Sequence, residues 1–530
     1  MRTFNVTGLC IPNKHYMVDI SGKLEKIMEM IDRGEYFTIN RARQYGKSTT
    51  LFLLAKSLPE EYTSISLSFE GVGETMFTSS ASFCQRFLLH VSKTLEKSEK
   101  EKDKNKDKDK SFAALWLDDT VIDFDLLGYH IDKLCKGKKI VLMIDEVDKT
   151  SNNRIFLHFL GLLRSMYLAN QAGASNAFHS VILAGVHDIR NIKLKMINEG
   201  SYTPAIGENQ LFNSPWNIAS DFNVDMSFNP CEITTMLAEY EKDHSTGMDI
   251  HSVADEIYKY TSGYPFLVSR LSQYIDSRSN QSWTIHGVQE AVQIILREKN
   301  TLFDDMIKNL INNKNLYSFL YNILFIGMKY EFNIYDPIIA LGAMYGFISS
   351  DEHNKVRVTN KIFEICIYDF IVSKEATSGK RINGVLQGDV TSGGRFNMEL
   401  CLIKFAEHYT EIFNARDAGF IEREGRLLFL SYLKPLINGR GYYHMESQFT
   451  DLRRMDIVVD YAREQFIIEL KLWKGEAEHD KAYEQLAGYM GSKGFAEGYL
   501  LTFDFRKGVN KQPYAKWVEY NGIRIFDVVV

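Results

Sequence analysis

Residues 37–58 read FTINRARQYGKSTTLFLLAKSL, a short apolar run followed by a glycine and then by a longer segment with apolar residues at helical spacing. This pattern predicts a strand that leads directly into an amphipathic helix. Amide groups at a helix N-terminus bind phosphate, and Gly46-Lys47-Ser48 has the ending of a P-loop. We therefore expect Gly46, Lys47, Ser48 and Thr49 to bind the phosphates of a nucleotide. Lys47 would reach the β- and γ-phosphates, and the Ser48 hydroxyl would be a ligand of Mg²⁺.

A second element, KIVLMIDEVDK at residues 139–149, supports this interpretation. It predicts a buried strand that delivers two carboxylates, Asp145 and Glu146, at its C-terminal end. Asp145 would hold Mg²⁺ through water, and Glu146 would polarise the attacking water. The same pattern also fits a buried strand followed by a helix N-terminus, where acidic residues are favoured anyway. Two elements in this order, separated by strand and helix patterns, favour nucleotide binding.

These elements are similar to those of a known family. The segments INRARQYGKST, MIDEVDK, VILAGVHDIRN and TSGYPFLVSRL together resemble the AAA-like ATPases of bacterial and archaeal genomes, which include archaeal ATPase and STAND-type relatives. The resemblance covers about residues 10–300 and implies ATP and Mg²⁺ as cofactors. Arg41 stands where a P-loop has its first glycine, and the family often has arginine-rich residues there.

The same resemblance implies roles for residues outside these motifs. Some would form a polar sensor at a strand end, some would begin the helical lid, and some would close over the base. They are His187 and Asp188 for the sensor, Gly263-Tyr264-Pro265 for the lid, and Tyr16 and Asp19 for the base. Arg190 or Arg270 could contact the γ-phosphate, from this chain or from a neighbour in a homo-oligomer. Each arginine also fits an ordinary surface or structural role.

The composition is that of a soluble globular protein of about three or four domains, with 530 residues, 45% hydrophobic and 25% charged. The formal net charge of -6 gives no overall attraction for nucleic acid, so such binding would need a local basic patch. The six cysteines form no CxxC pair, which argues against zinc and disulfides and is typical of a reducing cytoplasm. Because no run of about 18 apolar residues is present, we expect no membrane span.

We expect an α/β protein built from several parts. A charged run at residues 96–110, EKSEKEKDKNKDKDK, fits either a mobile insertion or a lengthened helix end. The parts are an AAA-like P-loop NTPase core at 1–230, a helical lid at 231–310, a winged-helix-like domain at 311–375, a polar glycine-rich linker at 376–395 and a final α/β domain at 396–530.

The final part contains FIIELKLW, a strand pattern that carries Glu469 and Lys471 on one face. Upstream lies RRMDIVVDYAREQ, and a turn at Ala462-Arg463 would pair the two segments so that opposed residue numbers sum to 925. Asp456 would then lie opposite Glu469, with Cβ atoms about 5 Å apart. Two close carboxylates repel each other unless a cation lies between them, and Mg²⁺ prefers such oxygen ligands. The alternative is a surface ion pair between Lys471 and either carboxylate.

This arrangement resembles the PD-(D/E)xK nuclease superfamily, in particular its RecB-like members with a QxxxY helix, over about residues 396–530. A helix pattern, EREGRLLFLSYLKPL, precedes the hairpin, and another, HDKAYEQLAGYM, follows it. The resemblance implies a restriction-endonuclease-like α/β fold. It assigns metal binding to Asp456 and Glu469, catalysis to Lys471, the helix carboxylate to Glu424 or its rival Glu422, and positioning of the DNA backbone or the lysine to Gln485 and Tyr489. Met455 stands in place of the family's proline.

Together the two halves predict a protein that binds and hydrolyses ATP and thereby controls a Mg²⁺-dependent nuclease domain, with DNA expected as substrate in preference to RNA. By family analogy, such a protein would act in the cytoplasm, in phage defence or in mobile-element biology. The alternative is a nucleotide-dependent sensor or DNA-binding regulator whose C-terminal domain does not cut.

Overall fold

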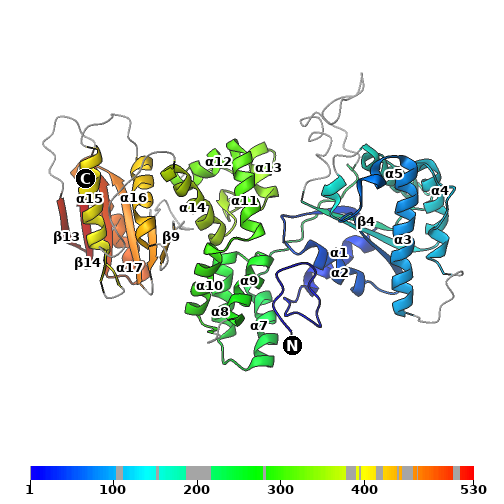
Figure 1. Cartoon of the computed structure of the whole chain (residues 1–530), viewed down its shortest axis with the longest axis horizontal. Helices are drawn as coiled ribbons and strands as arrows, with labels where there is room; N and C mark the ends of the chain where they lie inside the picture. The colour runs from blue at the N-terminus through cyan, green and yellow to red at the C-terminus, as the bar shows by residue number, and fades with distance from the viewer. Residues whose placement is uncertain are drawn as a thin grey trace, which may run out of the picture. The chain divides into compact units, whose positions relative to one another are not determined.

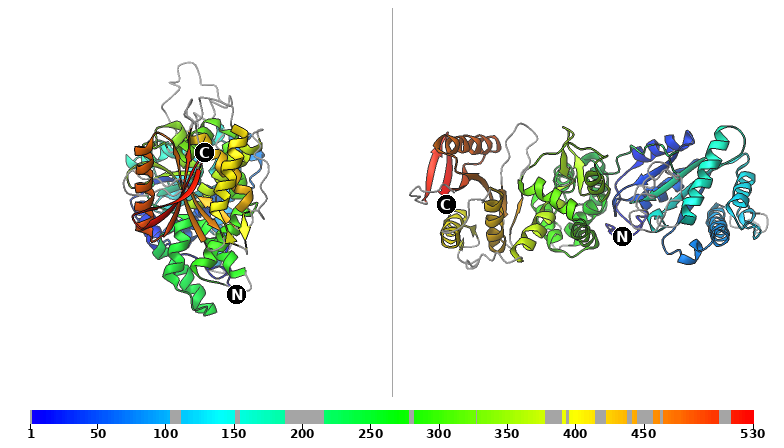
Figure 2. Two further views of the ribbon diagram at one scale, coloured as in Figure 1. Left: turned by 90° about the vertical axis from the view of Figure 1, so that its left-hand side faces the viewer. Right: turned by 90° about the horizontal axis from the view of Figure 1, so that it is seen from above.

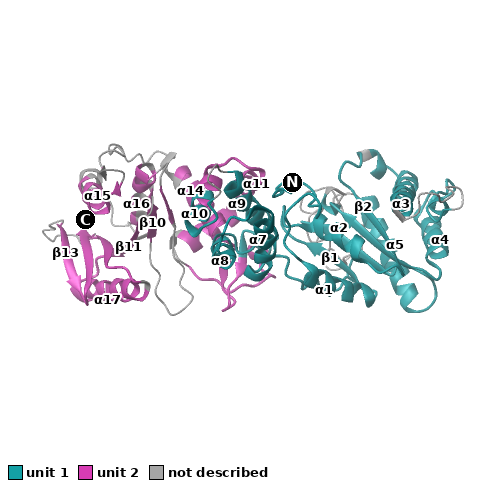
Figure 3. Ribbon diagram, turned by 90° about the horizontal axis from the view of Figure 1, so that it is seen from below, with its two compact units in different colours: residues 1–291, 340–348 teal, residues 292–339, 349–530 magenta. Residues whose placement is uncertain are grey.

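The computed structural model describes most of the chain. The described residues are 2–102, 111–150, 154–186, 216–277, 282–326, 328–377, 390–392, 395–413, 422–437, 441–444, 457–461, 464–504 and 514–530. The chain divides into two compact units, one of residues 1–291 with 340–348 and the other of residues 292–339 with 349–530 (Figure 3).

The first unit begins with an α/β core. Its elements are α1 (Ser21–Asp32), β1 (Tyr36–Asn40), α2 (Lys47–Ser57), β2 (Tyr62–Ser68), a 3-10 turn (Glu74–Phe77), α3 (Ser80–Lys102), a second 3-10 turn (Ala114–Trp116), α4 (Phe124–Cys135), β3 (Lys139–Asp145), a third (Val147–Thr150), α5 (Arg154–Gln171) and β4 (Ser180–Gly185). The strand and helix predicted around the P-loop are thus present as β1 and α2. The charged run begins as the end of α3, and residues 103–110 of it lie outside the described residues.

The four strands form a parallel sheet in the order β1-β4-β3-β2, and a single parallel bridge joins Phe37 of β1 to Ser220. Helices α1 and α2 pack on one face of this sheet, and α3, α4 and α5 pack on the other (Figure 1). Strands that are covered on both faces need continuous apolar sequence, as in β3, which is buried from Ile140 to Ile144. The carboxyl ends of β1, β3 and β4 share one edge, where parallel α/β sheets bind ligands.

A bundle of helices follows the core, within the segment that we expected to be a lid. These helices are α7 (Pro230–His244), α8 (Ile250–Thr261), α9 (Pro265–Ser277) and α10 (Ile285–Arg297). Helix α7 starts with a capping box between Asn229 and Glu232 and with a proline in its first turn, both strong start signals. The C-cap residue of α8, Ser262, adopts the left-handed region, as does Gly263 directly after it.

The next segment has the helix and hairpin order that we expected of a winged helix. It contains α11 (Thr301–Asn312), α12 (Lys314–Tyr321), a π-helical turn (Asn322–Ile326), α13 (Pro337–Met344), a two-stranded sheet of β5 (Ile348–Ser350) and β6 (Val356–Val358), and α14 (Lys361–Thr377). The expected linker is not wholly irregular, because α14 continues to Thr377 and a small antiparallel pair, β7 (Thr391–Ser392) and β8 (Arg395–Phe396), lies near its end.

The C-terminal part is a six-stranded sheet with helices on both faces. Its elements are α15 (Met398–Phe413), α16 (Glu422–Ile437), β9 (Gly441–His444), β10 (Ile457–Tyr461), β11 (Glu464–Leu472), α17 (Glu476–Lys493), β12 (Glu497–Phe503), β13 (Tyr514–Tyr520) and β14 (Ile523–Val529). The strand order is β13-β14-β12-β11-β10-β9, with β11, β12 and β14 parallel. Helix α17 covers one face and α15 and α16 the other (Figure 2). Within the described residues, none of the helices combines the length and the apolar character that crossing a membrane requires.

Candidate functional sites

The loop between β1 and α2 has the geometry of a phosphate site. Gln44 and Gly46 adopt left-handed backbone angles, with φ of 56° and 81°, which turn the chain sharply into the helix. The N-cap residue of α2 is Gly46, which has no side chain to cap the helix, and amide groups at such a helix start can bind an anion. The Lys47 ammonium donates hydrogen bonds to the carbonyl oxygens of Arg41 and Ala42, each at 2.9 Å, and so spans the loop from inside.

Burial dominates the electrostatics of Lys47, whose side chain is nearly covered. It lowers the pKa of the ammonium, while the carboxylates of Asp148, Asp145 and Glu146 raise it. The ammonium is thus placed between the loop carbonyl groups and the field of three carboxylates. For this ammonium the sequence predicts contact with the β- and γ-phosphates of a nucleotide.

Arg41, which replaces the first glycine of the P-loop, has a structural use. Its guanidinium donates to the carbonyl oxygens of Asn40 and Val224, each at 2.9 Å, and lies 5.3 Å from the centre of the Phe222 ring. Burial lowers the pKa of this guanidinium. Arg41 therefore ties the loop to residues 222–229, a segment that we call the strap, which runs from beyond Ser220 to the start of α7.

The two predicted nucleotide elements meet at the carboxyl edge of the sheet. The Ser48 hydroxyl donates to Asp145 Oδ2 at 2.5 Å, although the two residues are 97 positions apart. These oxygen atoms suit Mg²⁺, which prefers hard oxygen ligands. Glu146 follows in the left-handed region, with φ of 56°, and its amide donates to Asp145 Oδ1 at 2.9 Å. Non-glycine residues with such backbone angles are uncommon and cluster at functional sites.

Asp148 is a third carboxylate at this edge, and our sequence reasoning did not single it out. Its Oδ2 atom accepts a hydrogen bond from the Val186 amide, just after β4. A Cβ atom on Gly185 would lie 2.9 Å from both Asp148 oxygen atoms, so glycine is needed there. The signal was visible in the DEVD sequence, but only the fold shows that Asp148 lies between the end of β4 and Lys47. The expected sensor residues, His187 and Asp188, lie outside the described residues, as does Arg190.

A cavity of about 330 Å³ adjoins the phosphate loop. It begins at Gly46 and Thr49 and continues between largely apolar walls, whose residues include Ile20, Ile27, Leu53, Val224, Met226, Phe228, Met236 and Phe266. Thr49 accepts a hydrogen bond from the Cys10 amide at 3.2 Å, which ties the N-terminal segment to α2. The volume and apolar walls are those of a small-ligand site, and its position beside the phosphate loop suits the sugar and base of a nucleotide.

The two residues expected near the base behave differently. Tyr16 lines the cavity, and its hydroxyl donates to Asp243 at 3.0 Å. Burial, followed by the hydrogen bond to Asp243, raises the pKa of Tyr16 to about 12. Asp19 instead accepts a hydrogen bond from the Ser21 amide, and its own amide donates to Thr235 on α7. Tyr16 is thus a wall of the cavity, whereas Asp19 organises the start of α1.

The predicted lid segment contacts the phosphate loop directly. The Tyr264 hydroxyl donates to the Arg43 carbonyl at 2.5 Å, and its ring lies 4.7 Å from the Tyr45 ring. Gly263, with φ of 71°, lies against the strap, because a Cβ atom there would lie 1.8 Å from the Phe228 carbonyl oxygen. Arg270, the other candidate for the γ-phosphate, donates to Gln273 on its own helix.

The C-terminal sheet contains the predicted hairpin. Strands β10 and β11 are antiparallel, with Ile457 opposite Ile468 and Tyr461 opposite Glu464, which is the predicted sum of 925. The predicted register is therefore confirmed for these strands. Asp456, one residue before β10, lies outside the described residues, as do Arg453 and Arg454. Glu422 and Glu424 begin α16, and their side chains also lie outside the description.

Glu469 and Lys471 share one face of β11 and contact each other, with 2.7 Å between Lys471 Nζ and Glu469 Oε1. The Glu469 side chain is only 2% exposed, whereas that of Lys471 is 32% exposed. The structure therefore contains the Glu469–Lys471 ion pair of the alternative, with a buried carboxylate and a partly exposed ammonium. Burying a carboxylate is costly unless it is paired or binds a cation. The predicted helix residues lie on α17, where Tyr489 is buried against the sheet and Gln485 is half-buried.

Four residues that we had not predicted form a buried polar cluster on the α17 side of this sheet. Oδ2 of the fully buried Asp527 accepts hydrogen bonds from Tyr483 at 2.6 Å and from Tyr514 at 2.8 Å, and lies 3.0 Å from His479 Nε2. Burial, then Asp527, raises the pKa of both tyrosines. Leu500 pairs with both Glu469 and Asp527, so the two carboxylates belong to one cross-strand row. In the sequence, the one signal for this cluster was the spacing of His479 and Tyr483, which lie four residues apart and therefore on one face of a helix.

A parallel sheet of this order, with a P-loop after one strand and acidic residues after another, defines a P-loop ATPase domain. The chain belongs to the family of AAA-like domains, whose model matches residues 12–356. The family predicted from the sequence is thus confirmed for this part of the chain, and the match extends beyond the expected limit of about 300 into the segment that begins with α11.

Solved structures share only distant similarity with the chain. A Walker-type ATPase of Pyrococcus abyssi is 12% identical, with a TM-score of 0.47, over 69% of this chain and 99% of that one. The ORC2 protein of Aeropyrum pernix, in its ADPNP–ADP and ADP forms, is 10% identical, with a TM-score of 0.34, over 67% of this chain and 93% of that one. None of the curated proteins matches the chain.

Proposed function

We propose that this AAA-like protein binds and hydrolyses ATP with Mg²⁺, and that nucleotide occupancy controls a Mg²⁺-dependent phosphodiester hydrolase in its C-terminal sheet. The observation that carries the first part is the contact between Ser48 and Asp145, which brings the two nucleotide motifs together. The observation that carries the second is the buried Glu469 paired with Lys471 in the predicted hairpin register.

In the proposed ATPase site, the residues divide the work by chemistry. The amides at the start of α2 and the Lys47 ammonium hold the β- and γ-phosphates. The oxygen atoms of Ser48 and Asp145 would hold Mg²⁺, which would supply charge neutralisation at the phosphate oxygens. Glu146 orients the attacking water, and Asp148 keeps the end of β4 close to Lys47.

The ATPase proposal is tested by Glu146→Gln, with Glu61→Gln, at an exposed position of the same unit, as control. We expect Glu146→Gln to bind ATP like the wild type but to release phosphate about 100-fold more slowly, a typical loss for a catalytic acid–base group. Calorimetry and a phosphate-release assay measure the two properties. Equal turnover by Glu146→Gln and the wild type would remove Glu146 from the mechanism.

In the proposed hydrolase site, Glu469 would hold Mg²⁺ together with Asp456 and the Glu424 carboxylate. Mg²⁺ would stabilise the negative charge on the pentacoordinate phosphorus group of the transition state. Lys471, within contact distance of Glu469, would orient the attacking water. Gln485 and Tyr489 on α17 would position the backbone of the nucleic acid. DNA is the proposed substrate, and defence against foreign DNA or mobile-element biology the proposed setting.

The hydrolase proposal is tested by incubating the full chain with labelled DNA and RNA, with and without Mg²⁺ and ATP. Lys471→Met is the informative variant, and Lys481→Met is its matched control, because Lys481 forms an ion pair of the same 2.7 Å length with Glu478 on an exposed surface. We expect Mg²⁺-dependent cleavage by the wild type and the control but not by Lys471→Met. ATP dependence of the cleavage would support the control step. Cleavage by all three proteins alike, or by none, would leave a nucleotide-dependent regulator with a non-cutting C-terminal domain as the better account.

A further inference from the structure

The walls of the 330 Å³ cavity come from separate segments of the first unit. Helix α1 contributes Ile27, the strap contributes Met226 and Phe228, and α7 contributes Met236. Walls that come from distant parts of the sequence bind a flat ligand tightly only if a contact between them fixes their separation. Otherwise they must be ordered when the ligand binds, which lowers the affinity.

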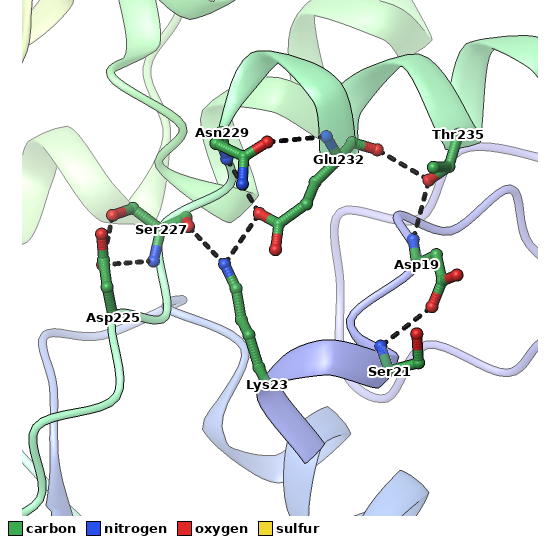
Figure 4. A network of polar contacts seen from close by, with 8 residues as sticks. All are labelled: Asp19, Ser21, Lys23, Asp225, Ser227, Asn229, Glu232 and Thr235. Atoms are coloured by element: carbon green, nitrogen blue, oxygen red, sulfur yellow. Dashed lines mark hydrogen bonds and ion pairs between the residues drawn. The ribbon is translucent and has the colours of Figure 1, made fainter. Parts of the chain in front are cut away.

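One side chain joins all three of these walls. The Lys23 ammonium, from α1, donates to the Ser227 carbonyl oxygen of the strap and to Glu232 Oε2 at the start of α7, both at 2.7 Å (Figure 4). It also lies 5.9 Å from the centre of the Phe228 ring. The Lys23 and Glu232 side chains are only 14% and 19% exposed, so water screens this pair less than it screens surface ion pairs.

The partner of Lys23 is itself held rigidly. Glu232 Oε2 accepts a hydrogen bond from the Asn229 amide at 2.8 Å, and the Glu232 amide donates back to Asn229 Oδ1 at 2.9 Å, which completes the capping box. A second connection runs beside it, in which the Asp19 amide donates to the Thr235 hydroxyl (Figure 4). Lys23 therefore anchors α1 to a fixed point on the first turn of α7.

From this arrangement we infer that Lys23 is a positioning residue for the nucleoside part of the ligand, a clamp that holds the base cavity at its working width. The inference rests on the proposed nucleotide site. The phosphate groups are bound elsewhere, by the loop around Lys47, so the clamp acts on the sugar and base and not on the triphosphate. Loss of Lys23 should therefore weaken binding of a nucleotide without weakening binding of inorganic triphosphate.

The experiment compares Mg²⁺–ATP and Mg²⁺–triphosphate binding to the full chain by calorimetry. The variants are Lys23→Met, Lys23→Arg, and Glu232→Gln, which keeps an oxygen for the capping box but loses the charge. Lys139→Met is the matched control, because Lys139 forms an ion pair of 3.0 Å with Glu61 that is largely exposed. Circular dichroism shows whether each variant is folded.

We expect Lys23→Met and Glu232→Gln to raise the Kd for ATP about tenfold, equivalent to about 1.4 kcal/mol, and to leave the Kd for triphosphate unchanged. Lys23→Arg, which keeps the charge and the donors, should stay close to the wild type, as should Lys139→Met. The clamp is overturned if Lys23→Met binds ATP normally, or if it loses affinity for both ligands equally. If the wild type binds neither ATP nor triphosphate, the nucleotide site itself is refuted.

Discussion

The nucleotide site of the first unit and the carboxylate site of the second differ in how their residues reach one another. The first site is built from two contiguous motifs, and each lies at the carboxyl end of a strand of one parallel sheet. The second draws its expected residues from α16, from the hairpin and from α17, and only Glu469, Lys471, Gln485 and Tyr489 among them have described side chains.

This difference teaches where a motif is sufficient and where it is not. In a parallel sheet, all strands end at the same edge, so two motifs at strand ends meet whatever the loops between them do. In a hairpin the register decides everything, because a slip of one residue turns each side chain to the opposite face. The second site thus depends on the register of β10 and β11 for the predicted position of Asp456 opposite Glu469.

The largest expected effect concerns Glu469. Because its carboxylate is buried beside Lys471, Glu469→Ala should remove the proposed metal ligand and slow the proposed phosphodiester cleavage about 1000-fold, the upper range for loss of an electrostatic catalytic group. ATP affinity should stay unchanged. Gel assays and calorimetry measure the two properties, with Glu478→Ala as the exposed control. An equal loss of ATP affinity would show that the two sites are not separable.

The converse change is Lys47→Ala. Removal of the ammonium that spans the phosphate loop should raise the Kd for ATP about 100-fold, since a charged hydrogen-bond donor contributes up to about 3 kcal/mol. Cleavage measured without ATP should not change. If Lys47→Ala binds ATP as tightly as the wild type, the phosphate loop is not the nucleotide site.

A third change tests how closely the lid approaches the strap. Gly263→Ala would place a Cβ atom 1.8 Å from the Phe228 carbonyl oxygen and should destabilise the protein by about 2–3 kcal/mol through backbone displacement. Gly247→Ala is the control, because Gly247 has a similar φ of 75° but no atom within 4 Å of the added Cβ. Urea unfolding of the full chain measures both. Equal losses would mean that backbone conformation, and not the contact, explains the glycine.

The smallest expected effect is in the buried cluster of the second unit. Tyr483→Phe removes one of the hydrogen bonds to Asp527 and should lower stability by about 1 kcal/mol. Tyr129→Phe, at a position that is 76% exposed, should have no measurable effect. A neutral Tyr483→Phe would show that the cluster adds no net stability, and attention would then turn to a functional role for Asp527 and His479.

Much of the fold followed from the sequence for local reasons. The P-loop, the acidic strand end and the pairing of β10 with β11 are set by short-range patterns, such as apolar periodicity and a glycine before a helix. The differences arose where local patterns are neutral. The charged run fits a helix as well as a mobile insertion, and α3 indeed continues into it to Lys102. The expected linker retains α14 to Thr377.

The sequence by itself determined which residues are candidates for chemistry in this protein. Residue type and spacing are enough to single out Lys47, Asp145, Glu469 and Lys471. Only the tertiary structure decided what surrounds them. Arg41 donates a hydrogen bond to the strap, and Asp148 accepts one from the residue after β4. Lys23 connects α1 to the strap and to α7, and Asp527 contacts His479 and two tyrosines. These contacts join residues far apart in the chain, and their energies depend on burial and register, which short-range sequence patterns do not specify.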